Sequence, residues 1–390
     1  MQLTKKIADF AGVELQFDAI LSFASVALLV LGYLMVCSAS LHLGLKGMNN
    51  IFHYPIRQFI HIFLGLAFGF CVYLTPLSLW EKYSQLLFFV GLFFLLIVFI
   101  PGLGVKVNGS VRWLSIGGLR IQVSEVMKLI VVVYMAGFIT RHQNFVQESV
   151  HALVRPLMLL SSACILLLLE PDMGSAVVIL TIAMGVMFLA GAQMKQFIAL
   201  ILGVVIIGVF AISLSEYRSK RVSGFLHPWE DPFGDSFQLV QALIAFGQGE
   251  WFGKGLGGGV QKMFYLPEAH TDFLFSVLGE ELGLIGIFSV ISLFTLIVWR
   301  AFSIALIAEN LNKTFHAFIA YGLGIWFGFQ SFVNMGVNMG ILPTKGLTLP
   351  FMSYGGGSMI VMCASMALLF RVSGELNMLE NASSREKHYV

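Results

Sequence analysis

Long runs of apolar residues recur along almost the whole of this 390-residue sequence. An α-helix needs about 20 mostly apolar residues to cross the hydrocarbon core of a bilayer, because each residue advances it by about 1.5 Å. Ten segments fit this length, and they lie at 19–41, 57–75, 84–101, 123–141, 154–170, 174–192, 196–215, 273–299, 314–337 and 352–372. We therefore expect an all-α, polytopic integral membrane protein with about ten transmembrane helices, forming a single domain over residues 1–390.

The composition agrees with this assignment. Hydrophobic residues make up 58% of the chain and charged residues 11%, and the mean hydropathy is +0.87. Soluble domains are usually about a quarter charged. The net charge of +2 provides no strongly basic surface, so we expect no nucleic-acid partner. The four cysteines all lie in apolar runs, and their spacing fits neither a disulfide framework nor a metal site.

Lysine and arginine residues near the helix ends predict the orientation of the chain. Ten crossings place both termini on one side, which carries eleven of these cations, against six on the other side once the long loop is left out. We therefore expect the N-terminal segment 1–18 and the tail 374–390 in the cytoplasm. Residues 216–272, between the seventh and eighth helices, become one long extracytoplasmic loop.

With this orientation, nearly all of the unusual sequence falls on the outer face. It comprises the stretches 108–125, 170–175, 253–272 and 342–358, which are polar or rich in glycine and proline, whereas the inner loops are short and ordinary. A chain that scattered its polar residues at random would not show this bias. The pattern indicates an extracytoplasmic active or binding site.

The first of these stretches brings two cations, Arg112 and Arg120, to the outer headgroup layer. A guanidinium group suits phosphate because it offers a bidentate fork of donors. Ser124 can cap the fourth helix, and Glu125 and Lys128, three residues apart on it, can pair. Two interpretations remain open: a membrane-anchoring amphipathic loop followed by an internal ion pair, or a cationic clamp for a phosphate-bearing lipid.

Two other outer stretches have turn chemistry. The sequence EPDMGS at 170–175 predicts a tight hairpin, in which Asp172 either caps the sixth helix or contributes to a site. Prolines and glycines interrupt any helix across 342–358, where Lys345 is the one cation. Irregular backbone near membrane depth is tolerated where it lines a cavity or is packed in protein, and we expect a cavity wall here.

The eighth segment opens with three carboxylates, Asp272, Glu280 and Glu281. Acids inside a membrane are costly and normally face the bundle interior or a wet cavity. In one interpretation Asp272 is a helix N-cap, and the glutamates pair with cations such as Lys128 or Arg112. In the other, Asp272 is a general base at the mouth of a cavity and the glutamates support it.

Two further features of the long loop invite a chemical interpretation. His270 lies two positions before Asp272, and it is either an alternative base or an interface residue. The run GLGGG at 255–259 could suggest a phosphate-binding loop. It lacks the strand–loop–helix setting and the Gly-Lys-Ser/Thr ending of such loops, so it is a weak nucleotide signal.

Four motifs occur in order along the chain: NGSVRWLSIGGLRIQVSEVMKL, EPDMGSA, YLPEAHTDFLFSVLGEELG and LPTKGLTLPFMSYGGGS. Together they resemble the signatures of the SEDS family (shape, elongation, division and sporulation), and the match spans about residues 15–375. The Pro-Thr-Lys-Gly form of the last motif resembles the FtsW branch. The resemblance implies a peptidoglycan glycosyltransferase that polymerises lipid II at the outer face of a bacterial cytoplasmic membrane, at the division septum, and releases undecaprenyl diphosphate.

The resemblance also implies roles for individual residues. It makes Asp272 the essential acid, as the base that takes the proton of the acceptor 4-hydroxyl group. It matches Arg112, Arg120, Lys128 and Lys345 to cations of the family that suit diphosphate and carboxylate groups. We also expect Glu125, His270 and Ser353 to bind substrate, and Asp172, Glu280 and Glu281 to support the site. Glu170 departs from the family, which has glutamine at that place.

The implied partners are lipid II, the lipid-linked glycan, membrane lipid, a class B penicillin-binding protein and other division proteins. The resemblance leaves open whether a divalent cation, magnesium or manganese, joins Asp272. Two other functions also stay open, a lipid II flippase and a division scaffold without chemistry. A flippase predicts polar residues that continue to the inner face, but the inner halves of the segments are apolar.

Overall fold

The computed structural model describes residues 17–107, 110–116, 119–143, 146, 154–213, 223–234, 236–263, 265–343 and 346–388. In this part of the chain each predicted apolar segment corresponds to one helix, although residues 98–101 and 352–355 of two segments lie outside it. The helices are α2 (Ala19–Met48), α3 (His53–Leu74), α4 (Leu77–Ile97), α5 (Val123–Arg141), α7 (Val154–Leu169), α8 (Met173–Leu189), α9 (Met194–Ser213), α12 (Leu274–Asn310), α13 (Thr314–Asn338) and α14 (Gly356–His388). By length and apolarity, six of them can cross a membrane, namely α2, α3, α4, α5, α12 and α14. The chain is therefore a multi-pass membrane protein.

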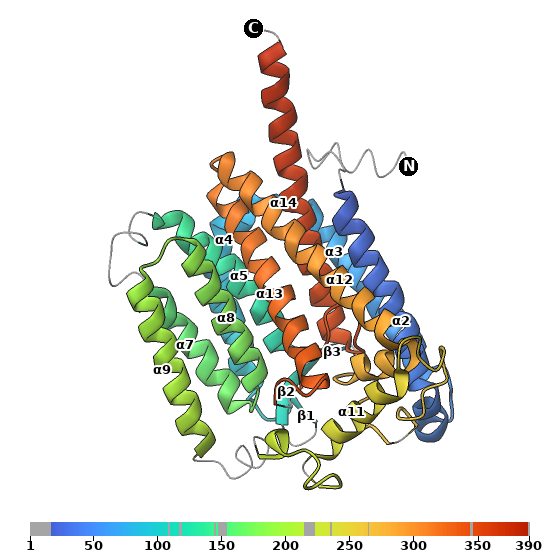
Figure 1. Ribbon diagram of the computed structural model, residues 1–390. Coiled ribbons are helices and arrows are strands. Elements are labelled where there is room, and N and C mark those ends of the chain that lie inside the picture. The colour runs from blue at the N-terminus through green and yellow to red at the C-terminus, as the bar shows by residue number, and fades with distance from the viewer. Residues whose placement is uncertain are drawn as a thin grey trace.

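The helices form a bundle (Figure 1), and they differ in how far they are buried inside it. Of the most apolar window of α5, 83% is buried inside the protein, whereas the corresponding share is 28% for α3 and 22% for α4. The outer helices expose large rings, such as Phe23 (65%), Phe63 (64%) and Phe93 (58%). A helix that is apolar all round must be covered by protein or lipid, so α5 is a core helix and α2, α3 and α4 face lipid.

A small antiparallel sheet corrects the all-α prediction. Its strands, in the order β1-β2-β3, are β1 (Gly104–Val107), β2 (Ser110–Ile116) and β3 (Leu119–Gln122). In the register, Trp113 lies opposite Val105 on one side and Gln122 on the other. Backbone groups beside the bilayer must find hydrogen-bond partners, and strand pairing supplies them without a helix. The strands are too short for their alternation to stand out against the apolar background.

The long loop also contains regular structure, because the 13-residue helix α11 (Phe237–Gly249) packs against α12. The sheet and α11 lie at one end of the bundle, and the start of α2 and the end of α14 lie at the other (Figure 1). The described part of the predicted tail, 374–388, continues α14 as a helix. The fold thus gathers the outer stretches of the sequence at one end.

Candidate active site

Asp272 lies in the turn that precedes α12. The backbone N–H groups of Thr271 and Phe273 both donate to the carbonyl of Glu268, at 3.1 and 3.2 Å. This turn delays the helix, which begins at Leu274 with Phe273 as its N-cap and no side-chain cap bond. The interpretation of Asp272 as the helix cap is therefore wrong. Among the described residues, no side chain donates a hydrogen bond to its carboxylate.

Two asparagines of α13 hold the backbone of this turn. The side-chain amides of Asn334 and Asn338 each donate to the carbonyl of Asp272 at 2.9 Å. The other end of the Asn338 side chain accepts from the backbone and the hydroxyl of Ser276, at 3.1 and 2.7 Å. Sequence reasoning missed both residues, although the four-residue spacing of Gln330, Asn334 and Asn338 on an apolar helix was a usable signal.

The loop before α14 faces the same turn. The Asn334 amide also donates to the carbonyl of Leu347 at 2.6 Å, and the Tyr354 N–H donates to the carbonyl of His270 at 2.9 Å. A Cβ atom added at Gly346 would lie 2.9 Å from Asp272 Oδ2, so the carboxylate points at this loop. Lys345, predicted as its cation, lies outside the described residues.

The loop before α14, which we expected to line a cavity, is mostly packed inside the protein. Its residues Leu347, Leu349, Phe351 and Met352 are buried, so most of the segment is packed inside protein. The hydroxyl of Ser353 accepts from the N–H of Leu349 at 2.9 Å, which uses it within the turn. Packing of this kind satisfies irregular backbone at membrane depth equally well.

The predicted hairpin between α7 and α8 is confirmed, and Arg112 is attached to it. Its guanidinium donates to the carbonyls of Glu170 and Pro171, at 2.9 and 2.6 Å. Asp172 caps α8 by accepting from the N–H of Ser175 at 3.2 Å. Strand β2 is thereby bound to the hairpin, with one of the predicted outer cations at the junction.

Asp172 also links α8 to α5. It accepts from the Ser124 hydroxyl at 2.8 Å and from the Gln122 side-chain amide at 3.1 Å. Helix α5 begins at Val123 with Gln122 as its N-cap, so Ser124 is inside the helix. The expectation that Ser124 caps this helix is therefore wrong, because its hydroxyl serves Asp172 instead.

The pair predicted from spacing alone, Glu125 and Lys128, is confirmed at 2.7 Å. The ammonium group also donates to Gln330 at 2.8 Å and lies 5.5 Å from the ring centre of Trp326. Lys128 is 0% exposed, so it is engaged inside the protein. Arg120 on β3 is exposed, and within the described ranges its side chain has no ion-pair or hydrogen-bond partner.

The two glutamates of α12 do not pair with Lys128 or Arg112. Glu281 bonds to Lys262 and to Ser38, and Glu280 accepts from the backbone N–H of Val260 at 2.7 Å. Both are 0% exposed. The cation that pairs with Glu281 is Lys262, in the loop before α12. Spacing along one helix could not identify a partner outside that helix.

The protonation of Asp272 suits a base. Burial raises the pKa of its carboxyl to about 7, the charge of Glu268 raises it further, and Arg112 opposes both effects. An ideal general base has a pKa near the working pH, so that it is both available and basic. Burial instead lowers the pKa of His270, which packs between the rings of Tyr54 and Tyr354.

A metal site was left open by the sequence. In the described ranges, no group of three histidine, cysteine, aspartate or glutamate residues is arranged to hold an ion. Asp272 would therefore offer a cation one carboxylate, with the remaining ligands coming from substrate or water.

Glu170 is the unusual acid of the hairpin. Neither of its buried carboxylate oxygens has a hydrogen-bond partner in the described structure. Burial and the neighbouring Asp172 raise its pKa to about 8, which Arg112 partly offsets. The folded protein therefore holds a proton here that the unfolded chain loses at a lower pH, so stability falls as pH rises through about 8.

Replacing Glu170 with glutamine should remove this dependence. The Glu170→Gln variant should melt at a higher temperature than the parent at pH 8.5, since the parent then carries a buried charge, and the two should converge near pH 5. Thermal unfolding in detergent across this range measures the difference. Equal melting temperatures at pH 8.5 would contradict the buried-charge explanation.

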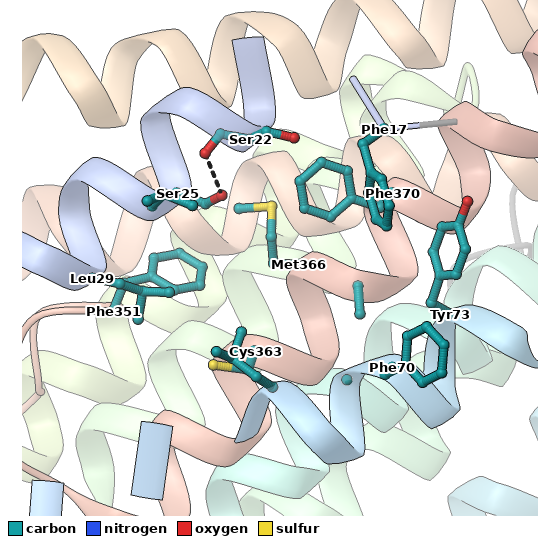
Figure 2. Close-up of a pocket in the computed structure, with 14 residues that line it drawn as sticks. Phe17, Ser22, Ser25, Leu29, Phe70, Tyr73, Phe351, Cys363, Met366 and Phe370 are labelled. Carbon is teal, nitrogen blue, oxygen red and sulfur yellow. Dashed lines mark hydrogen bonds between the residues drawn. The ribbon is translucent and has the colours of Figure 1, made fainter. Parts of the chain in front are cut away.

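A separate apolar cavity of about 280 Å³ lies between α2, α3 and α14 (Figure 2). Rings and aliphatic chains such as Leu29, Phe70 and Phe370 line it. The hydroxyl of Ser25 bonds within its own helix, to the carbonyls of Leu21 and Ser22. None of the predicted site residues lines this cavity, so we do not assign the reaction to it.

Comparison with known proteins places this geometry in a family. The model of the cell cycle protein family of FtsW, RodA and SpoVE matches residues 19–378. The chain is 60% identical over 370 residues to the probable peptidoglycan glycosyltransferase FtsW of Methylomonas methanica, with 95% of each chain covered. It is 54% identical over 358 residues to the protein of the same name from Methylococcus capsulatus, covering 92% of this chain and 90% of that one.

Solved structures agree. A chain of a peptidoglycan synthase complex, described for its coordination of polymerization and crosslinking, matches with a TM-score of 0.76 at 27% identity, covering 93% of this chain and 99% of that chain. The rod shape determining protein RodA of Thermus thermophilus matches with a TM-score of 0.66 at 26% identity, covering 92% and 97%. The chain therefore belongs to the FtsW, RodA and SpoVE family of cell cycle proteins, the SEDS family.

Proposed function

We propose that this protein is the peptidoglycan glycosyltransferase of cell division, which polymerises lipid II at the outer face of the cytoplasmic membrane. The observation that carries the proposal is the carboxylate of Asp272. It has a pKa of about 7, and it does not cap α12, whose N-cap is Phe273. The 60% identity to a probable FtsW glycosyltransferase supports the reaction class. In the orientation that the sequence predicts, with ten crossings and both termini in the cytoplasm, this carboxylate lies on the side where lipid II is used.

The reaction needs one proton transfer at this carboxylate. Asp272 takes the proton of the 4-hydroxyl group on the acceptor sugar as the hydroxyl oxygen attacks the anomeric carbon of the donor. The bond from that carbon to the diphosphate breaks, and undecaprenyl diphosphate leaves with the bonding electron pair. Arg112 and Arg120, at the same end of the bundle, are the cations that we assign to the diphosphate.

The partners follow from the same assignment. One solved relative comes from a complex that coordinates polymerization and crosslinking. We assign this chain a class B penicillin-binding protein as its crosslinking partner, together with other division proteins at the septum. The donor is the lipid-linked glycan, and no nucleotide sugar is needed at the outer face.

Purified protein with its transpeptidase partner and labelled lipid II tests the function. We expect glycan polymer on a gel, and addition of magnesium or manganese determines whether a divalent cation contributes. Absence of polymer together with translocation of lipid II in vesicles would favour a flippase. Absence of both would favour a scaffold.

The pH dependence of polymerisation should report Asp272. With a pKa of about 7, the carboxylate is the active form above that pH and is lost by protonation below it. With the transpeptidase partner at a saturating concentration, the value of kcat/KM should therefore rise about tenfold between pH 6 and pH 8. Initial rates in buffers of constant ionic strength measure the profile, and a flat profile over this range would contradict the assignment.

A further inference from the structure

The turn that contains Asp272 leads directly into α12, and this helix is interrupted. Inside α12, Gly283 has φ 63° and ψ −160°, so the helix consists of a short segment up to residue 282 and a long segment from 284. A Cβ atom added at Gly283 would lie 2.4 Å from the backbone nitrogen of Gly253 and 2.6 Å from the carbonyl oxygen of Trp251. Only glycine fits, because the preceding loop passes against the break.

The loop replaces the hydrogen bonds that the break removes. In a continuous helix the N–H groups of residues 284 and 285 would donate to the carbonyls of 280 and 281. Here they donate to the carbonyls of Glu250 and Trp251, at 3.0 and 3.3 Å. The freed carbonyls accept from the N–H groups of residues 254 and 255, both at 3.0 Å. The loop is thus inserted into the helix ladder.

The two buried carboxylates hold the same loop from their side chains. Glu280 accepts from the backbone of Val260 at 2.7 Å and of Gln261 at 3.2 Å, and Glu281 accepts from the backbone of Gly257 at 3.1 Å. A Cβ atom at Gly259 would lie 2.9 Å from Glu280 Oε2. The glycine-rich run therefore wraps an anion, and that anion is the chain's own pair of glutamates.

A buried lysine completes the arrangement and ties it to α2. The ammonium group of Lys262, 4% exposed, bonds to Glu281, and it donates to the hydroxyl of Ser38 at 2.7 Å. The Ser38 hydroxyl in turn lies 2.7 Å from Glu281 Oε1. We call Ser38, Lys262, Glu280 and Glu281 the clasp. Buried ion pairs are weak evidence for stability, so a role in geometry is the stronger explanation.

We propose that Lys262 and Glu281 are positioning residues for the glycosyltransferase reaction, and this rests on the function proposed above. The short segment of α12 is held at its start by Asn338, through Ser276, and at its end by the clasp. Asp272 is attached to the start of this segment. The clasp fixes the tilt of the segment, and hence the place where the carboxylate meets the acceptor hydroxyl. It touches no reacting atom.

The test measures two things in the purified full chain with its partner: the kinetics of polymerisation, and the hydrogen exchange of backbone amides in the loop before α12. Lys262→Met should lower kcat for lipid II polymerisation about tenfold or more, because small misplacements of a reacting group are costly. The KM for lipid II should stay within about twofold, since binding groups are not touched. Lys262→Arg, which keeps the charge, should recover most of kcat. Hydrogen exchange of the amides at 254–261 should accelerate in Lys262→Met.

Two further variants keep the result interpretable. Gly283→Ala disturbs the same break without removing a charge, and it should reproduce the loss of kcat. Arg300→Met removes the 2.7 Å ion pair to Asp18 at the far end of α12, and it should leave kcat unchanged. Faster exchange with unchanged kcat in Lys262→Met would reduce the clasp to a structural role, and unchanged exchange would show that it does not hold the loop.

The outcome separates the two proposals. Polymer from the parent protein with no kinetic effect of Lys262→Met or Gly283→Ala overturns the positioning role alone. No polymer from the parent protein under any partner overturns the function and the positioning role together. Loss of kcat in both Lys262→Met and Gly283→Ala, with normal kcat in Arg300→Met, supports the inference.

Discussion

Replacing Asp272 with asparagine should abolish polymerisation of lipid II, with kcat reduced at least about a hundredfold. General base catalysis typically contributes 10²–10⁴-fold, and an amide cannot accept the acceptor proton. The fold should survive the change, because Asn334 and Asn338 bond to the backbone carbonyl of residue 272 and not to its side chain. Gel analysis of products from labelled lipid II, with enzyme and partner at fixed ratio, measures the loss.

A matched substitution shows whether the loss is local. Asp18→Asn makes the same chemical change at the far end of the bundle, where Asp18 caps α2 and pairs with Arg300. We expect this variant to polymerise at close to the parent rate. Polymerisation by a folded Asp272→Asn variant at the parent rate would remove Asp272 from the chemistry, and His270 would become the next candidate base.

The helices were predictable because a membrane imposes one simple requirement on sequence. A segment that crosses lipid must form its backbone hydrogen bonds internally and present apolar side chains. A helix built from one continuous run of apolar residues meets both requirements, so such a run can be recognised in the sequence. The Glu125–Lys128 pair was predictable for a similar reason, since residues three apart share a helical face. The cap at Asp172 depends only on a short turn motif.

The missed features depend on segments that are distant in the sequence. Ser38 meets Glu281 across 243 positions, and no periodicity records such a contact. The same is true of the asparagines of α13, which meet the turn of Asp272 more than 60 positions before them. The sheet was missed for a different reason, because strands of four to seven residues carry too few alternations to be distinguished from an interfacial loop.

For Asp272, the structure adds information that the sequence pattern lacks. Spacing along the chain could not choose between a helix cap and a base. The turn closed by Glu268 moved the start of α12 to Leu274, which removed the cap as an explanation. Two backbone hydrogen bonds therefore exclude the helix cap, and the role of Asp272 as a base stays a prediction.

Replacing Lys128 with methionine should destabilise the folded protein by about 3–5 kcal/mol, the usual cost of removing one partner of a buried ion pair. Lys128 is 0% exposed and Glu125 is 4% exposed, so the remaining carboxylate would have no access to water. Gln330 would also lose a donor, as its side-chain oxygen accepts from Lys128 at 2.8 Å. Thermal unfolding in detergent, followed by intrinsic fluorescence, measures the change.

The double variant Glu125→Gln/Lys128→Met distinguishes stability from function. It removes both charges, so most of the lost stability should return, because uncharged groups of similar shape replace a buried pair at little cost. If Lys128 only holds α5 to α13, polymerisation should return with stability. If Lys128 also meets the substrate diphosphate, stability should return while kcat/KM stays low. A single Lys128→Met variant as stable as the parent would contradict the buried pair, since the uncompensated carboxylate must then have found water.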